Sequence, residues 1–462
     1  MPYGGAGWSF DFGPQLTLNG NFGSAQQLWL NLPDGTQFGF GYNSLLGQFV
    51  PLDSTADAQR KSRFTVTLVG GAPGSWATVN TASTTWTVED RDRGITYTMV
   101  SRKRPSESGF VSGTATTIAF RGGYSWTIAY GSDAEISTVT DVFGRTLTFS
   151  WYTGLGVTSS YKLLVKQIVL PDGTALNYTY KKPWESVYGT VWSSWYDVLT
   201  NVEHVLNPAG SGPSNVITAT TYHYEDGRFP YFLTGITDGR GVRYATWTYD
   251  DKGRDTESFH GSGQDSTSFA YSDVNATTRT RTLTNALGKD AIYTYVKSDA
   301  QWLLTDVDGQ ASTNCAASDS SYTYTAKLRD TLTNEEGRVT KYQRNADGWP
   351  TQTIEAFGTA DARQTDMTWT SDHQLASVDA PGLSSDYTYD LAGRLSTFTQ
   401  TDTTSHSLPY ATNGQTRSWT YTYTADGLLE SVDGPLSGTG DTIDYTYDAS
   451  GYLETVTRLR TH

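Results

Sequence analysis

The residue of this sequence that is best placed for acid–base chemistry is His223, which stands between Tyr222 and Tyr224. On a β-strand, its side chain would face opposite to the two tyrosines. A histidine that shares a groove with tyrosine and arginine can serve as base, acid and charge neutraliser in the β-elimination of a polysaccharide. The simpler interpretation, which we favour, is that His223 replaces a threonine on one face of an ordinary strand.

The remaining candidates do not form a predicted catalytic, metal or cofactor site. The six histidines show neither His-x-His nor His-Glu-x-x-His spacing, so no zinc site is expected. The Asp-Val-Asp-Gly segment at 306–309 begins like a calcium loop but lacks the other ligands, and we interpret it as an Asp-Gly turn. Cys315 is the only cysteine, which excludes an intrachain disulfide and a thiolate metal site. We therefore assign no catalytic residue, cofactor or metal, and favour a protein that is not an enzyme.

Three tryptophans form the densest aromatic cluster of the sequence: Trp184, Trp192 and Trp195. An exposed aromatic platform of this kind could bind carbohydrate or a partner chain. Packing where layers or ends of a sheet meet is the other interpretation, and the one we favour.

The composition indicates an all-β protein with an acidic surface. Aromatic residues make up 13% of the chain and include 30 tyrosines, while 46 glycines are available for turns. The net charge is 33 − 48 = −15, which argues against a nucleic-acid or anionic-membrane partner. Solubility of a large sheet explains this charge, and a negatively charged lumen for a basic cargo is a weaker alternative. No segment is apolar for long enough to span a membrane.

Hairpin repeats run through most of the chain. The clearest copies, 387–395 and 445–453, share the pattern Tyr-x-Tyr-Asp-x-x-Gly-x-Leu. Residues i and i+2 of a strand share a face, so the two tyrosines lie side by side, while Asp opens a turn and Gly supplies a positive φ. Further copies are 421–429, the shortened 222–228, and 247–254, in which Trp247 replaces the first tyrosine.

A second repeated sequence pattern, apolar-Thr-Asp/Asn-x-x-Gly-Arg/Lys, occurs at 139–145, 283–289 and 332–338. Together the two sequence patterns predict a long antiparallel meandering sheet. Arginines that follow the turn glycines, such as Arg145, Arg338 and Arg394, should form strand-edge ion pairs with neighbouring aspartates. We divide the chain into a β-rich N-terminal region, 1–135, and the repeat array, 136–462.

These repeats and the opening Gly-Ala-Gly-Trp-Ser-Phe at 5–10 resemble Rhs/YD-repeat proteins, a family that includes bacterial Rhs polymorphic toxins, the C components of Tc toxin complexes and the teneurin shell. The resemblance implies a sheet wound as a spiral into a hollow shell around a polypeptide cargo, often a toxin. Members that release cargo carry an Asp-Pro-x-Gly-Leu segment. This chain has only a superficially similar Asp-Gly-Pro-Leu at 433–436, so self-cleavage and toxicity are not carried over.

The first functional hypothesis is therefore a structural shell segment of a large secreted or surface-associated bacterial protein, which encloses or presents a polypeptide or neighbouring parts of the same protein. A surface adhesin that binds carbohydrate or a partner cell is the second, and a secreted polysaccharide-degrading enzyme the third. The first residues do not form a signal peptide, and the sequence ends directly after a strand-like stretch. We expect export by another route or a piece of a longer protein, and too few residues to close a shell.

Overall fold

The computed structural model describes most of the chain from residue 15 to residue 458. The described ranges are 15–19, 27–32, 37–43, 48–52, 63–69, 84–102, 112–132, 135–152, 164–181, 197–299, 301–311, 317–406 and 412–458. Trp184, Trp192, Trp195 and Cys315 lie outside these ranges, so their predicted roles stay predictions.

The described residues form a single 34-stranded antiparallel sheet with one short 3-10 helix, Pro213–Asn215. The N-terminal strands are β1 (Gln15–Asn19), β2 (Gln27–Asn31), β3 (Gln37–Asn43), β4 (Gln48–Pro51), β5 (Phe64–Leu68), β6 (Thr85–Asp90), β7 (Ile95–Arg102), β8 (Ser112–Phe120) and β9 (Ser125–Tyr130). Next come β10 (Ile136–Asp141), β11 (Thr146–Tyr152), β12 (Leu164–Val169), β13 (Ala175–Lys181), β14 (Val198–Val205), β15 (Val216–His223), β16 (Gly235–Thr237), β17 (Arg243–Tyr249), β18 (Asp255–His260) and β19 (Gln264–Asp273).

The second half of the sheet continues the same meander, with one strand paired to the next. Its strands are β20 (Thr278–Thr284), β21 (Asp290–Ser298), β22 (Gln301–Gly309), β23 (Ser320–Thr325), β24 (Leu328–Thr333), β25 (Val339–Arg344), β26 (Pro350–Glu355), β27 (Arg363–Trp369), β28 (Leu375–Ala380), β29 (Leu383–Tyr389), β30 (Leu395–Asp402), β31 (Thr416–Tyr423), β32 (Leu429–Asp433), β33 (Ile443–Tyr447) and β34 (Leu453–Arg458). The predicted all-β fold and antiparallel meander are confirmed. One local prediction is wrong: residues 306–309 belong to β22 and form no turn.

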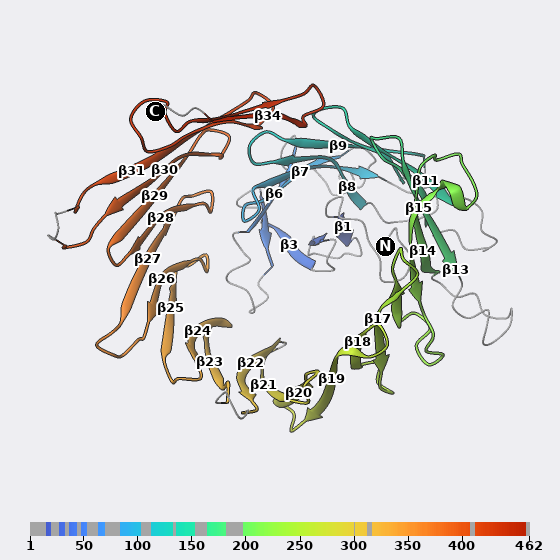
Figure 1. Cartoon of the computed structure of the whole chain (residues 1–462), viewed down its shortest axis with the longest axis horizontal. Coiled ribbons are helices and arrows are strands. Elements are labelled where there is room, and N and C mark those ends of the chain that lie inside the picture. The colour runs from blue at the N-terminus through green and yellow to red at the C-terminus, as the bar shows by residue number, and fades with distance from the viewer. Residues whose placement is uncertain are drawn as a thin grey trace.

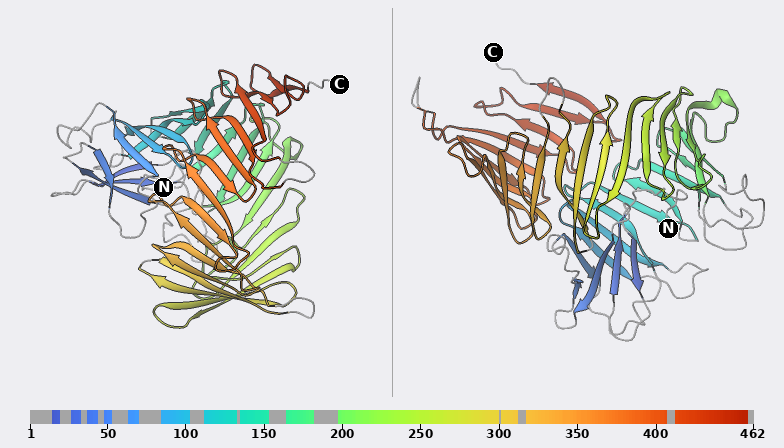
Figure 2. Two further views of the ribbon diagram at one scale, coloured as in Figure 1. Left: turned by 90° about the vertical axis from the view of Figure 1, so that its left-hand side faces the viewer. Right: turned by 90° about the horizontal axis from the view of Figure 1, so that it is seen from below.

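The sheet bends into a ring rather than staying flat. Viewed along the ring axis, the strands follow one another around the perimeter, and β34 returns to lie over β9 (Figure 1). Strands β1–β3 lie within the outline of the ring, and the perpendicular views place them toward one of its ends (Figure 2). The wall completes one circuit without closing into a barrel, and the expectation that 462 residues are too few to close a shell stays a prediction.

The N-terminal strands build the hydrophobic core. Strand β1 pairs with the first residues of β8, and β9 pairs with the last ones, so the sheet branches at β8. Strands β1–β4 fold back from this branch over β5–β8 and enclose a cluster of fully buried side chains, among them Leu28, Phe40 and Trp86. Burying each such side chain contributes about 1.5–3 kcal/mol, so this two-layered unit is the stable foundation of the wall.

Beyond β17 the wall is a single layer. The last fully buried hydrophobic residue in the described part of the chain is Ala245, and the buried residues that follow it are polar. The aromatic side chains of the later strands are half-buried, because they are covered by neighbours in the sheet and not by a second layer. Strands β9 and β10 pair directly, so the sheet continues across the predicted boundary at residue 135, which stays a prediction. No helix in the described ranges has the length and hydrophobicity needed to cross a membrane.

Candidate functional site: the inner face and the seam of the ring

Each repeat turn is held by the aspartate that opens it. In the 387–395 copy, Asp390 Oδ1 accepts hydrogen bonds from the backbone N–H groups of Ala392 and Arg394, both at 2.9 Å. Gly393 takes a φ of 76°, which a side chain would disfavour. The Arg394 Nε–H donates to Asp390 Oδ2 at 2.7 Å. Asp and Gly therefore form the corner, and the arginine fixes it.

The predicted ion pairs with aspartate are confirmed for Arg145 and Arg394, and the prediction is wrong for Arg338. Arg145 pairs with Asp141 at 2.6 Å in the same manner as Arg394 with Asp390. Arg338 differs, because asparagine opens its turn, and it pairs with Glu336 at 3.1 Å. These pairs join residues within one turn, so they stabilise corners and leave the faces of the sheet unaffected.

The turn of Asp250 makes the stability of the array depend on acid pH. Hydrogen bonds from the Arg254 backbone N–H, and then from its side chain, lower the pKa of Asp250 from 3.8 to about 2. A depressed carboxyl pKa stabilises the fold above 3.8, and this stabilisation is lost as the pH falls through about 2. We expect the urea midpoint to fall over this window, and less steeply in Asp250→Asn. Equal slopes in both proteins would contradict the assignment.

The second tyrosine of the repeat connects consecutive hairpins. Its hydroxyl donates to a leucine carbonyl on the preceding hairpin at 2.5–2.8 Å, in the pairs Tyr249–Leu233, Tyr324–Leu304, Tyr389–Leu375, Tyr423–Leu395 and Tyr447–Leu429. The register of each tyrosine-bearing hairpin shifts at the same tyrosine, for example between Thr422 and Tyr423. A bulge disrupts the backbone ladder, so the tyrosine supplies a hydrogen bond where the ladder is weakest.

Removal of one such hydroxyl should loosen the array locally. For Tyr423→Phe we expect a loss of about 1 kcal/mol, measured as faster amide hydrogen exchange in β30 and β31. Tyr421→Phe is the matched control, because the Tyr421 hydroxyl has no hydrogen-bond partner among the described residues. Equal exchange rates in the two variants would show that the hydroxyl does not link the hairpins.

The two faces of the array have different chemistry. Tyr387, Phe398 and Trp419 stack across three strands, with ring centroids 5.0 and 5.2 Å apart. The opposite face carries hydroxyl pairs between neighbouring strands, such as Thr422 with Ser431 at 2.7 Å. We call these the aromatic face and the hydroxyl face.

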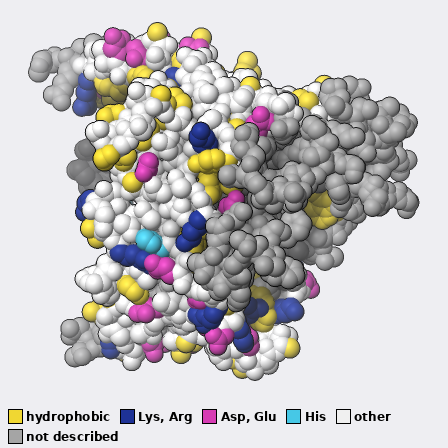
Figure 3. Space-filling view, turned by 90° about the vertical axis from the view of Figure 1, so that its right-hand side faces the viewer, with side chains coloured by type: hydrophobic (Ala, Val, Ile, Leu, Met, Phe, Trp, Pro, Cys, Tyr) yellow, Lys and Arg dark blue, Asp and Glu magenta, His cyan; other side chains and the backbone are white. Residues whose placement is uncertain are grey.

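The aromatic face points into the ring. Phe149 and Trp151 on β11 have the same positions relative to a register shift as Tyr387 and Tyr389 on β29. Both pack against the core that β1–β5 build, and Figure 1 shows β1 and β3 inside the ring outline. In the described part of the outward surface seen in Figure 3, most atoms are neither hydrophobic nor charged, as a threonine- and serine-rich face requires.

The ring closes where turns from its two ends meet. The Gly122 N–H donates to the Ala392 carbonyl at 2.9 Å, and Arg121 Nη2 donates to the Asp372 carbonyl at 2.8 Å. Farther along, the Arg145 guanidinium lies 5.0 Å from the ring centroid of Tyr452. We call this contact between turns 91–94, 121–124 and 142–145 and turns 371–374, 391–394, 425–428 and 449–452 the seam. Its partners advance along the sequence in the same order, as a spiral requires.

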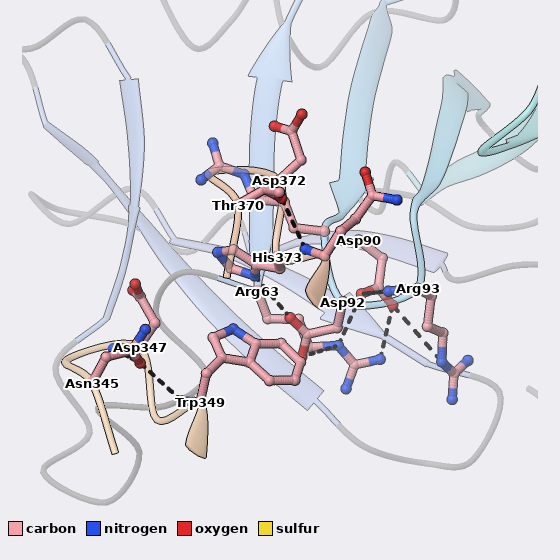
Figure 4. Close-up of polar contacts among 12 residues, drawn as sticks. Arg63, Asp90, Asp92, Arg93, Asn345, Asp347, Trp349, Thr370, Asp372 and His373 are labelled. Atoms are coloured by element: carbon pink, nitrogen blue, oxygen red, sulfur yellow. Dashed lines mark hydrogen bonds and ion pairs between the residues drawn. The ribbon is translucent and has the colours of Figure 1, made fainter. Parts of the chain in front are cut away.

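A buried histidine lies at the start of the seam. His373 Nδ1 is 3.1 Å from Asp92 Oδ1, and the Trp349 ring packs edge-on against the imidazole (Figure 4). Below them, Arg63 donates two hydrogen bonds to Asp90, at 3.0 and 2.8 Å. The seam thus includes polar side chains from both ends of the wall.

His373 occupies the position that glycine holds in the other repeats, with a φ of 59°. A non-glycine residue there costs about 1–2 kcal/mol, so the contacts with Asp92 and Trp349 must offset that strain. Sequence reasoning did not identify His373 as functional. The available signal was the missing turn glycine in the copy at 367–375, although Met367, Trp369 and Thr370 also replace the two tyrosines and the aspartate there and only the final leucine persists.

His223, the candidate acid–base residue, lies on the hydroxyl face. Its Nε2 is 2.7 Å from Thr237 Oγ1, and its Nδ1 is 3.6 Å from Glu225 Oε1, which also binds Arg243. Burial and the positive charge of Arg243 lower the pKa of His223, so the imidazole is neutral at pH 7. Both ring nitrogens thus face protein groups. No cluster of three potential metal ligands occurs among the described residues.

Fold and site together define a class: a repeat-built, single-layer β-wall that bends into a ring and joins its own first strands through turns. No family model and no curated protein matches the sequence. Among solved structures, the chain is similar to TcdB2-TccC3 without its hypervariable C-terminal region, with a TM-score of 0.44 and 11% identity over 96% of this chain. For TcdB2-TccC3-TEV the values are 0.36 and 9%, also over 96%. The chain spans about a quarter of those chains, 27% and 24%. Because both TM-scores lie below 0.5, we draw no functional conclusion from them.

Proposed function

We propose that this chain is a wall segment of a YD-repeat shell that encloses an unfolded or loosely folded polypeptide, in a large secreted or surface-associated bacterial protein. The observation that carries the proposal is the inward, half-exposed aromatic face of a single-layer wall. A compact protein would cover such a face with a second layer, whereas the described residues after Ala245 include no fully buried hydrophobic side chain. Half-exposed tyrosine and tryptophan contact an extended chain through both their rings and their polar tips.

Site-specific crosslinking on adjacent residues tests this role. The photoreactive residue p-benzoylphenylalanine is placed either at position 421, on the aromatic face, or at position 420, on the hydroxyl face. The probe is a labelled, uncharged, unstructured 30-residue peptide. We expect crosslinking from position 421 and little from position 420, together with protection of the peptide from protease. Equal labelling from both positions, or none from either, would overturn the proposal.

A further inference from the structure

Basic and acidic side chains are sorted onto opposite faces of strands β20–β25. The cross-strand registers place Arg279, Arg281, Lys297, Arg329 and Arg344 on the aromatic face, and none of the acidic residues that these registers pair within β20–β25 lies on it. We call these five residues the basic inner strip. On the hydroxyl face of the same strands lie Asp290, Asp306 and Asp308, with Lys341 as the basic residue. The sorting is notable because the whole chain has a net charge of −15.

Three arginines of the basic inner strip stack on aromatic rings. The guanidinium carbon of Arg279 lies 3.2 Å from the ring centroid of Trp302, and that of Arg281 lies 5.0 Å from Tyr271. Arg329 lies over Tyr322 at 4.6 Å. Stacking on a ring face orients a guanidinium while its N–H groups remain available at the edge. The rings therefore hold the charges in place without neutralising them.

Within the part of the chain that the structure describes, most of these cations have no acidic partner. Arg281 is 3.5 Å from Asp273, but within the described ranges no carboxylate lies within 4.0 Å of Arg279, Lys297, Arg329 or Arg344. Among the described residues, the buried Nε atoms of Arg279 and Arg344 have no hydrogen-bond partner, while Arg344 Nη1 donates to the Gly348 carbonyl at 3.2 Å. Unpaired cations gathered on one face, in a protein with surplus carboxylates, indicate that the missing anions come from a bound molecule.

We propose that the basic inner strip binds an acidic segment of the enclosed polypeptide, through arginine–carboxylate pairs flanked by tyrosine and tryptophan. This deepens the proposed shell function and rests on it. The strip lies across the ring from β6–β9 in Figure 1, so a chain held there faces the N-terminal strands. A lumen for a basic cargo, the alternative that the net charge suggested, does not fit this face.

A polypeptide is a better match than a nucleic acid. Single-stranded nucleic acid needs a continuous basic groove, because it carries a charge at every nucleotide. Here the five cations lie on only four of the six strands β20–β25, and the acidic hydroxyl face and the net charge of −15 repel a polyanion at long range. A polypeptide with separated glutamates or aspartates can pair with the arginines and place its apolar residues on the rings.

The test measures fluorescence anisotropy of labelled unstructured 30-residue peptides, one rich in glutamate, one rich in lysine and one uncharged, and of oligo-dT. We expect the glutamate-rich peptide to bind most tightly, and its affinity to fall with added salt. Lys297→Gln/Arg329→Gln should weaken it about tenfold, since each exposed charge pair contributes up to about 1 kcal/mol. The matched control, Arg338→Gln/Lys341→Gln, removes the same charge from a turn and from the hydroxyl face and should leave affinity within twofold.

The outcomes separate this inference from the shell proposal. Tighter binding of the lysine-rich peptide or of oligo-dT overturns the acidic-segment assignment, as does equal weakening in both double variants. If the uncharged peptide binds as tightly as the glutamate-rich one, the acidic preference is wrong while the shell proposal stands. If no peptide binds at all, both proposals fail together. Circular dichroism of each variant shows that the sheet is intact before affinities are compared.

Discussion

Arg63→Met should destabilise the N-terminal unit by about 3–5 kcal/mol. Asp90 has only 1% of its side chain exposed, and Arg63 neutralises it through two hydrogen bonds. Loss of this partner leaves a buried carboxylate whose remaining hydrogen bond from the described residues is a 3.3 Å contact with the Arg93 backbone N–H. A buried charge that loses its partner costs this much because its desolvation is no longer offset. Urea unfolding followed by tryptophan fluorescence reports on the unit, since Trp86 is fully buried in it.

Arg93→Met provides the control on the same carboxylate. Its guanidinium lies 4.0 Å from Asp90 and is 55% exposed, so its removal should cost less than about 1 kcal/mol. Asp92, which also faces Arg63 at 3.8 Å, bonds His373 across the seam. Arg63→Met should therefore also speed hydrogen exchange in turn 371–374, which Arg93→Met leaves unchanged. Similar losses in both variants would mean that Asp90 does not depend on Arg63.

The features that sequence predicted are those encoded within a few residues. Asp390, Gly393 and Arg394 form their corner from within one turn, so the pattern alone was sufficient to predict the turn, its positive φ and its ion pair. The spacing of the two tyrosines likewise predicted that they share one face of the sheet. Sequence could not predict which face points inward, because that depends on where the N-terminal strands pack.

The seam lies beyond sequence reasoning for a physical reason. Arg121 and Asp372 are separated by 251 residues, and His373 and Asp92 by 281. Their meeting depends on the accumulated bend and twist of all the strands between them, and no local pattern specifies that sum. The sequence did contain one signal of the seam, because histidine replaces the turn glycine of the repeat at position 373.

The distribution of charges between the two faces could be predicted from the sequence only in part. Arg279 and Arg281 can be assigned to the face of Tyr271 by counting alternate residues across a regular pairing. The same counting fails on β22. The pairing of β22 with β21 shifts by one residue between Thr294 and Tyr295, so residues of β22 on the two sides of the shift no longer alternate regularly between the faces. Only the structure shows that Asp306 faces outward while Leu304, two residues before it, faces inward.

Gly427→Ala should open the seam. A Cβ at this position would clash with the Gly122 carbonyl oxygen, which belongs to the backbone and cannot rotate away. The φ of 86° adds about 1–2 kcal/mol of local strain in any case. Separation of the two turns relieves this clash at the lowest cost in energy, and it also breaks the nearby hydrogen bond from the Gly122 N–H to the Ala392 carbonyl. We expect a larger radius of gyration in small-angle X-ray scattering and faster hydrogen exchange in turns 121–124 and 425–428.

Gly337→Ala is the control that separates opening of the seam from local backbone strain. Gly337 has a similar φ of 73° in an equivalent turn, but a Cβ there meets nothing within 4 Å. It should show the same local strain with an unchanged radius of gyration, because its turn is not part of the seam. If Gly427→Ala behaves like Gly337→Ala, the seam does not hold the ring closed, and the spiral must be maintained by the curvature of the sheet alone. If only Gly427→Ala expands, turn-to-turn contact is what converts a curved sheet into an enclosing wall.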